Sequence, residues 1–152
     1  MNIKTRKCKL SDYDFVIDLV RKTIFPLVSK YYEVDENIYK ERFKIDFKER
    51  KILEIDKKPI GFYQTKQNND ELEIKGLFLI DEYRNKGIGK YLMEEFEKIK
   101  EIKSLVLKVW DNNNAVEFYK KLGYKIVEEK DHKFLMKKNR HEKSTDRLKR
   151  VS

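Results

Sequence analysis

The sequence predicts an α+β protein of one domain, built on a mixed β-sheet. Three observations predict this class. The length of 152 residues is typical of one domain that can bury a core. Four segments carry apolar residues at helical spacing, and turn-rich breaks divide consecutive strand-like runs. One strand–helix–strand unit then requires two of the strands to run parallel.

The N-terminal part predicts one strand and two helices. The strand covers Ile3 to Leu10, and Ser11, which two acids follow closely, is a suitable helix start. The apolar face of this first helix consists of Phe15, Ile17, Leu19, Val20 and Ile24. The second helix covers Asn37 to Phe47, and its expected anchors are Ile38, Phe43 and Phe47.

Three strands joined by short turns follow. They cover Lys51–Ile55, Ile60–Lys66 and Leu72–Ile80, and the breaks between them are rich in turn-forming residues. These strands predict an antiparallel meander. The third strand first alternates and then becomes continuously apolar over residues 77–80. This change indicates a strand that passes from a sheet edge into the buried centre.

The C-terminal part predicts a helix, a buried strand, a second helix and a hairpin. Apolar residues at helical spacing indicate a helix over Gly87 to Lys100, and Ser104 to Trp110 forms the buried strand. A short helix over residues 115–122 ends at Gly123. The final hairpin consists of Tyr124–Glu129 and Lys133–Lys137.

The composition excludes several classes of protein. Cys8 is the single cysteine, so no internal disulfide can form and a reducing compartment is expected, with Cys8 as a small core residue. The N-terminus has no apolar signal core, and no apolar run is long enough to span a bilayer. One cysteine and two distant histidines cannot form a zinc site. We therefore expect a cytoplasmic protein with no metal and no membrane partner.

The positive charge is concentrated at the C-terminus. The chain has a net charge of +9, and the stretch Lys137 to Arg150 has seven Lys or Arg against two Asp or Glu. We expect residues 1–137 to form the single domain and residues 138–152 to form a basic, disordered, solvated tail. A weak contact between this tail and nucleic acid is the alternative.

Two of the five glycines lie where a strand is followed by a helix, at Gly87 and Gly89. The first turn of a helix has unpaired N–H groups and a positive dipole end, and glycine allows a ligand to approach the main chain. Arg84, Lys86 and Lys90 add positive charge. The segment predicts a phosphate or pyrophosphate site, although a plain tight turn would account for the glycines equally well.

A second motif follows the buried strand, in the stretch VWDNNNAVEFYKKLGYKIV from Val109 to Val127. Residues 112–114 lie at the carboxyl end of that strand, where open α/β sheets bind ligands. If the two parallel strands separate after Leu79 and Val109, their unpaired main-chain groups would face each other. An extended ligand that contains amides could then bond there like an additional strand.

Both motifs resemble those of the GNAT superfamily of N-acetyltransferases. Residues 84–89, read as RNKGIG, resemble its acyl-CoA-binding pattern Arg/Gln-x-x-Gly-x-Gly/Ala. The second motif matches the family pattern at Asn112, Ala115, Phe118, Tyr119, Gly123 and Tyr124. The resemblance covers roughly Ile3 to Lys137 and is weak over residues 20–50. It implies a central mixed, mostly antiparallel sheet of about six to seven strands, flanked by about four helices.

The resemblance implies acetyl-CoA as cosubstrate. Main-chain N–H groups of residues 84–89 would hold its pyrophosphate, and its pantetheine arm would lie along residues 77–79, where an amide at or near Leu79 polarises the thioester carbonyl. Asn112 would bond the pantetheine arm. The implied cofactor-binding residues are Leu77, Phe78, Leu79, Arg84, Asn85, Lys86, Gly87, Ile88, Gly89, Lys90, Asn112, Ala115, Phe118 and Lys121.

The family chemistry also suggests catalytic residues. Acetyl transfer requires a neutral amine, and a lysine-type amine has a pKa of about 10.4, so a base must take its proton. Glu73 matches a strand glutamate of the histone-acetylating branch; Glu71 and a water chain are alternatives, because a bulge could exchange the two faces of the strand. Tyr119 matches the family tyrosine that assists departure of the thiolate.

The sequence leaves the acceptor and the oligomeric state, monomer or homodimer, open. The acceptor is a primary amine of a small molecule or a protein. Its expected pocket lies between the N-terminal helices and the last hairpin, with the following candidates for walls and acids: Phe25, Tyr31, Tyr32, Tyr39, Glu33, Asp35 and Glu36. Two other functions remain open: a nucleic-acid-associated protein that uses the basic tail, and an acyl-CoA-binding module without turnover.

Overall fold

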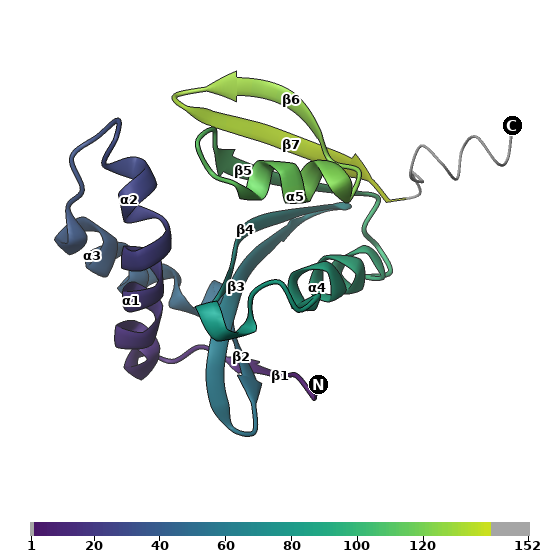
Figure 1. Cartoon of the computed structure of the whole chain (residues 1–152). Coiled ribbons are helices and arrows are strands. Elements are labelled where there is room, and N and C mark those ends of the chain that lie inside the picture. The colour runs from purple at the N-terminus through teal and green to yellow at the C-terminus, as the bar shows by residue number, and fades with distance from the viewer. Residues whose placement is uncertain (1, 141–152) are drawn as a thin grey trace, which may run out of the picture. The chain divides into compact units, whose positions relative to one another are not determined.

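The structure is a computed structural model that describes residues 2–140 (Figure 1). Within this range seven strands form a sheet in the order β1-β2-β3-β4-β5-β7-β6. The strands are β1 (Lys4–Lys7), β2 (Arg50–Ile55), β3 (Lys58–Asn68), β4 (Glu71–Leu79), β5 (Ser104–Trp110), β6 (Lys125–Lys130) and β7 (Lys133–Asn139). The helices are α1 (Tyr13–Thr23), α2 (Phe25–Val28), α3 (Glu36–Asp46), α4 (Ile88–Glu97) and α5 (Ala115–Lys121). The predicted α+β class and mixed sheet are confirmed.

The described chain divides into two compact units. Unit 1 comprises residues 2–66 and 75–89, and unit 2 comprises residues 67–74 and 90–140. In unit 1, β1 and β3 each pair antiparallel with β2. The core of unit 1 joins α1 and α3 to β2 and β3 and is formed by Cys8, Val16, Leu19, Val20, Phe43, Ile52 and Phe62. Cys8 is the expected core residue, and its burial raises the pKa of its thiol to about 11.

Unit 2 contains the parallel pairing that the strand–helix–strand unit predicted. The N-terminal part of β4 pairs parallel with β5, from Glu71 opposite Ser104 to Ile74 opposite Leu107. β7 lies antiparallel to both β5 and β6. β7 runs to Asn139, two residues beyond the predicted strand end at Lys137.

Two hairpin turns of the sheet place non-glycine residues in the left-handed region. Asp56 and Lys57 connect β2 to β3 with φ of 51° and 64°. Asp131 and His132 connect β6 to β7 with φ of 52° and 65°. Two-residue loops with both φ values positive are the turns that match the twist of antiparallel strands.

The structure corrects the sequence prediction at three points of unit 1. Ser11 does not start α1, because a short 3-10 helix, η1 (Leu10–Asp12), precedes it and shortens the first strand to β1. The expected anchor Ile38 is 60% exposed. The side of α3 that faces the core carries Tyr39 and Phe43, and Ile38 points away from that side. The short helix α2 was not predicted; Pro26 lies in its first turn, where proline is favourable.

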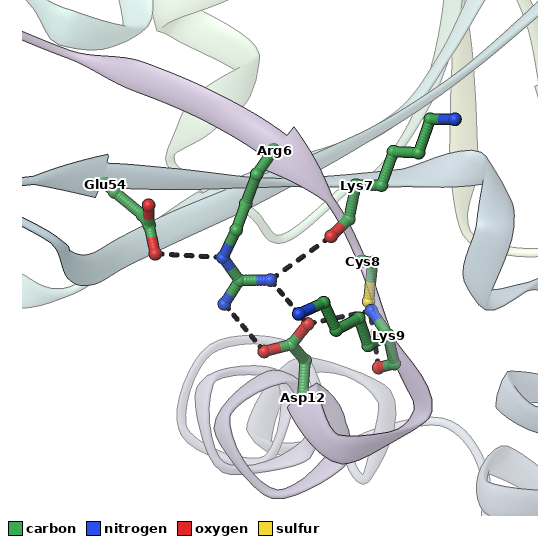
Figure 2. A network of polar contacts seen from close by, with 6 residues as sticks. All are labelled: Arg6, Lys7, Cys8, Lys9, Asp12 and Glu54. Carbon is green, nitrogen blue, oxygen red and sulfur yellow. Dashed lines mark hydrogen bonds and ion pairs between the residues drawn. The ribbon is translucent and has the colours of Figure 1, made fainter.

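The side chain of Arg6 connects β1, β2 and η1 in one polar network (Figure 2). Its Nε donates to Glu54 at 2.9 Å, and its two terminal nitrogens donate to the two carboxylate oxygens of Asp12, each at 2.9 Å. Asp12 also accepts from the main-chain N–H of Lys9 at 2.8 Å. The hydrogen bonds from Arg6 hold the pKa of Asp12 below its usual value. Arg6, Asp12 and Glu54 therefore all have charged partners within this cluster.

The described residues were also compared with the requirements for a membrane span and for a metal site. Among the described residues, no helix is both long and apolar enough to cross a bilayer. No group of three His, Cys, Asp or Glu side chains in residues 2–140 is arranged to hold a metal ion.

Candidate functional site

Two residues of the turn before α4 adopt left-handed main-chain conformations. Asn85 and Gly87 adopt φ of 59° and 82°, both in the left-handed region. A Cβ atom built on Gly87 would meet nothing within 4 Å, so the surface above it is open. Gly87 is therefore needed for its backbone conformation, and α4, a ten-residue helix, begins at the next residue.

The cations of this turn are exposed and have only weak partners. Arg84 donates to the main-chain oxygen of Leu79 at 3.0 Å and pairs with the exposed Asp81 at 3.1 Å. The ammonium group of Lys86 lies 5.5 Å from the centroid of the Tyr83 ring. Exposed pairs of this kind contribute little to stability, so these cations can turn toward a bound anion at little cost.

The last residues of β4 are half-buried, and their side chains differ in role. The ring of Phe78 stacks on Phe62 with centroids 4.7 Å apart, and so belongs to the core of unit 1. β3 approaches β4 closely here, because a Cβ on Gly61 would lie 2.1 Å from the main-chain oxygen of Phe78. The Phe78 ring is thus engaged in packing, and Leu77 and Leu79 are its half-buried neighbours on β4. The tight contact at Gly61 had no recognisable signal in the sequence.

The second motif lies wholly in unit 2, at the end of β5. Asn113 accepts a hydrogen bond from the main-chain N–H of Ala115 at 2.9 Å and so caps α5. Asn112 is half-buried beside it. The sequence analysis did not assign a role to Asn113, although asparagine just before a helix is a common cap. Lys121 is exposed, and Phe118 packs edge-to-face on Tyr119 with ring centroids 5.2 Å apart.

Tyr119 is a buried tyrosine in the last turns of α5. Its side chain packs between Phe118 and Tyr124, and burial raises the pKa of its hydroxyl to about 12. The phenol is therefore protonated at neutral pH and can donate a hydrogen bond. None of the residues in the described range 2–140 forms a hydrogen bond with this hydroxyl.

The two candidate bases on β4 differ in their surroundings. Glu71 accepts from the Ser104 hydroxyl at 3.4 Å and pairs with Lys137 at 3.6 Å. Glu73 is half-buried, and none of its neighbours in the described part of the chain pairs with its carboxylate. Glu71 is therefore the engaged carboxylate of the two, and the role of Glu73 as the base stays a prediction.

The expected acceptor residues of unit 1 are largely engaged in packing and capping. Tyr39 packs edge-to-face on Phe25 with centroids 6.0 Å apart, and its hydroxyl lies 3.5 Å from the Arg50 guanidinium. Asp35 caps α3 by accepting from the main-chain N–H of Asn37. Glu36 is held by Arg21. The exposed members of the set are Tyr31, Tyr32, Glu33 and Asp35.

Comparison with known proteins agrees with both motifs. Residues 48–126 match a family model described as an acetyltransferase (GNAT) domain. The spermidine N(1)-acetyltransferase of Thermoplasma acidophilum is 29% identical, over 91% of this chain and 98% of its own length.

Solved structures extend the similarity to the fold. The PaiA N-acetyltransferase from Thermoplasma acidophilum, solved in complex with coenzyme A, matches with a TM-score of 0.73 and 28% identity, over 91% of this chain and 99% of its own. An acetyltransferase from Thermus thermophilus matches with a TM-score of 0.72 at 14% identity, over 91% and 97% of the two chains. The second match supports the fold alone.

Proposed function

The chain belongs to the GNAT family of acetyltransferases, and from that premise we propose that it transfers the acetyl group of acetyl-CoA to a primary amine of a polyamine. The chain is an N-acetyltransferase with the fold of relatives that bind coenzyme A. The observation that carries the acceptor class is the match to a spermidine N(1)-acetyltransferase over nearly the whole of both chains.

The turn at residues 84–89 is proposed to bind the pyrophosphate of acetyl-CoA. The left-handed conformation of Asn85 and Gly87, the open surface above Gly87 and the exposed Arg84 and Lys86 support this assignment. Main-chain N–H groups at a helix start bind phosphate oxygens with good geometry. A main-chain N–H near Leu79 would polarise the thioester carbonyl.

The transfer itself is proposed to use two side chains of unit 2. Glu73, directly or through a water, takes a proton from the ammonium group of the acceptor, because only the neutral amine is a nucleophile. The amine attacks the thioester carbonyl, and collapse of the tetrahedral intermediate expels the thiolate of coenzyme A. Tyr119 donates a hydrogen bond to the departing sulfur. Its pKa of about 12 exceeds that of a thiol, about 8.5, so Tyr119 stays protonated while the C–S bond breaks, and transfer of its proton to the sulfur is completed only when Tyr119 is protonated again.

Release of free thiol from acetyl-CoA tests this function across a panel of amines. The panel contains spermidine, spermine, a peptide with a free N-terminus, a lysine peptide and an aminoglycoside. We expect turnover with the polyamines. Tyr119→Phe should lower kcat about 100-fold and leave the KM for acetyl-CoA unchanged. Tyr91→Phe is the matched control, because Tyr91 is an exposed tyrosine of α4.

The outcomes separate the parts of the proposal. Thiol release with peptides alone would overturn the polyamine acceptor. Wild-type turnover in Tyr119→Phe would remove Tyr119 from the mechanism. Absence of binding heat when coenzyme A is titrated into the protein would overturn the donor.

Two substitutions at Gly87 distinguish two reasons for a glycine here: its left-handed backbone conformation, and the approach of coenzyme A to the main chain. Asn tolerates φ near 82°, whereas Ala does not. Both side chains have room in the free protein. If coenzyme A must approach the main chain here, Gly87→Asn should keep the melting temperature of the free protein but weaken coenzyme A binding measured by calorimetry. Full affinity in Gly87→Asn would mean that the pyrophosphate binds elsewhere.

The alternative function in nucleic-acid binding depends on the basic tail, residues 138–152, of which residues 141–152 lie outside the described residues. A truncation to test it must start after Arg140. The Nη1 atom of Arg140 donates to the main-chain oxygens of Ile99, Lys100 and Ile102 at 2.9–3.0 Å, and a cut at residue 138 would remove this anchor. Salt-sensitive DNA or RNA binding that the truncation abolishes would favour the alternative.

A further inference from the structure

A buried hydroxyl without a protein partner lies beside the proposed acid. Tyr124 is 3% exposed, and its hydroxyl has no hydrogen-bond partner within the described range 2–140. Burying a hydroxyl without a partner is costly, and phenylalanine would fill the same space without that cost. Such a group therefore requires an explanation, and an ordered water or a chemical role provides one.

Tyr124 is joined to Tyr119 through both main chain and side chain. The N–H of Tyr124 donates to the main-chain oxygen of Tyr119 at 3.0 Å, immediately after α5 ends. The two rings pack edge-to-face with centroids 6.0 Å apart. Neither hydroxyl is held by another side chain of the described residues. The two phenols therefore form one buried pair.

An ion pair lies near Tyr124. Glu97 of α4 and Lys138 of β7 pair at 2.7 Å, with side chains 20% and 13% exposed. The methylenes of Lys138 pass within 3.3 Å of a Cβ built on Gly123, whose φ of +100° also requires glycine. Lys138 is thereby placed next to the residue that precedes Tyr124. Both charged side chains of the pair are partly exposed, so they reach solvent.

We propose that Tyr124 is a positioning residue that acts through Tyr119: its hydroxyl and an ordered water return a proton to Tyr119 from the Glu97–Lys138 end after each transfer. The inference rests on the proposed role of Tyr119 and goes beyond it. Tyr119 of α5 and Glu97 of α4 are the titratable groups that act on Tyr124, and Lys138 of β7 pairs with Glu97. Burial, together with the charge of Glu97, raises the pKa of Tyr124, so the relay starts with both phenols protonated.

The steps balance without any oxidation or reduction. Tyr119 gives its proton to the thiolate of coenzyme A and becomes a phenolate. The Tyr124 hydroxyl gives its proton through the water to that phenolate, and takes another from water at the Glu97–Lys138 pair. The net result is the passage of one solvent proton to the thiol.

The test compares kcat across pH for the whole chain and three variants. Tyr124→Phe keeps the ring and removes the relay hydroxyl, so kcat should fall about 10-fold and the fall should deepen as pH rises, because water becomes a poorer proton source. The KM for acetyl-CoA should not change. Lys138→Met should shift the pH profile in the same direction by a smaller amount. Tyr91→Phe, the exposed control on α4, should match the wild type.

A double variant distinguishes a relay from a general loss of packing. In a Tyr119→Phe background, Tyr124→Phe should have no further effect on kcat, because the relay has no group left to serve. An equal fall in both backgrounds, or an unchanged pH profile in Tyr124→Phe, overturns the relay. Wild-type thiol release is measured in the same assay, so failure of the proposed function appears as an inactive wild type and is not confused with failure of the relay.

Discussion

Two polar clusters of the molecule differ in how completely they are paired. In unit 1, Arg6 meets the carboxylates of Asp12 and Glu54, and each of these three charged side chains has a partner (Figure 2). In unit 2, Glu97 and Lys138 pair with each other, yet the nearby Tyr124 hydroxyl has no partner among the described residues.

This difference in pairing indicates a structural role for the Arg6 network and a chemical role for Tyr124. A fully paired network fixes the geometry of the elements that contribute to it, and Arg6 fixes β1 and β2 against the start of α1 in this way. An incomplete cluster costs stability, and proteins retain such groups where chemistry needs them. Arg6 should therefore control stability, and Tyr124 should control turnover.

The largest expected effect on stability is the loss of Arg6. Arg6→Met removes the cation between two partly buried carboxylates and should lower the free energy of unfolding by about 2 kcal/mol, less than for a fully buried pair because the side chains are partly solvated. Urea denaturation measures the change. Lys7→Met is the control, because Lys7 is the exposed neighbour on β1. A similar loss in both variants would contradict a specific role for the network.

A smaller effect should appear as a dependence of stability on pH. The Arg6 guanidinium lowers the pKa of Asp12 in the folded state, so the contribution is fully present above the unfolded value of about 3.9 and is lost as pH falls through the folded pKa. Asp12→Asn should therefore be less stable than the wild type by about 1 kcal/mol at pH 7. The urea midpoints of the two proteins should converge as pH falls below the lowered folded-state pKa of Asp12. A difference that persists in acid would assign the effect to packing.

The smallest expected effect concerns the stability of Tyr124→Phe. Removal of a buried hydroxyl that lacks a protein partner should leave the free energy of unfolding unchanged or raise it by up to about 1 kcal/mol. Thermal denaturation of this variant beside the wild type measures it. A clear loss of stability would show that the hydroxyl is held more firmly than its surroundings indicate, and the contrast between the two clusters would weaken.

Most of the fold could be predicted from periodicity and turn chemistry. The breaks at residues 56–59 and 67–70 located the meander, and helical spacing located α4 and α5. Positions that depend on the partner surface could not be predicted in this way. Ile38 is more apolar than Tyr39, yet Tyr39 faces the core, because the inward direction of α3 is set by where Phe43 docks.

The candidate site was only partly predictable for a similar reason. The glycine turn and the asparagine motif are local, so residues 84–89 and Tyr119 could be named from the sequence. The choice between Glu71 and Glu73 depends on Ser104 and Lys137, which lie far away in the sequence and engage only Glu71. The surroundings of Tyr124, formed by Glu97 and Lys138, are equally non-local.

The hairpin turns of the sheet have a practical consequence. Lys57 and His132 hold backbone conformations that glycine adopts freely, and each costs the folded state about 1 kcal/mol compared with glycine. Neither residue belongs to the proposed catalytic set. Glycine at these two positions should therefore raise the melting temperature of the protein. Variants near Tyr119 that lose stability could then be studied in this stabilised protein.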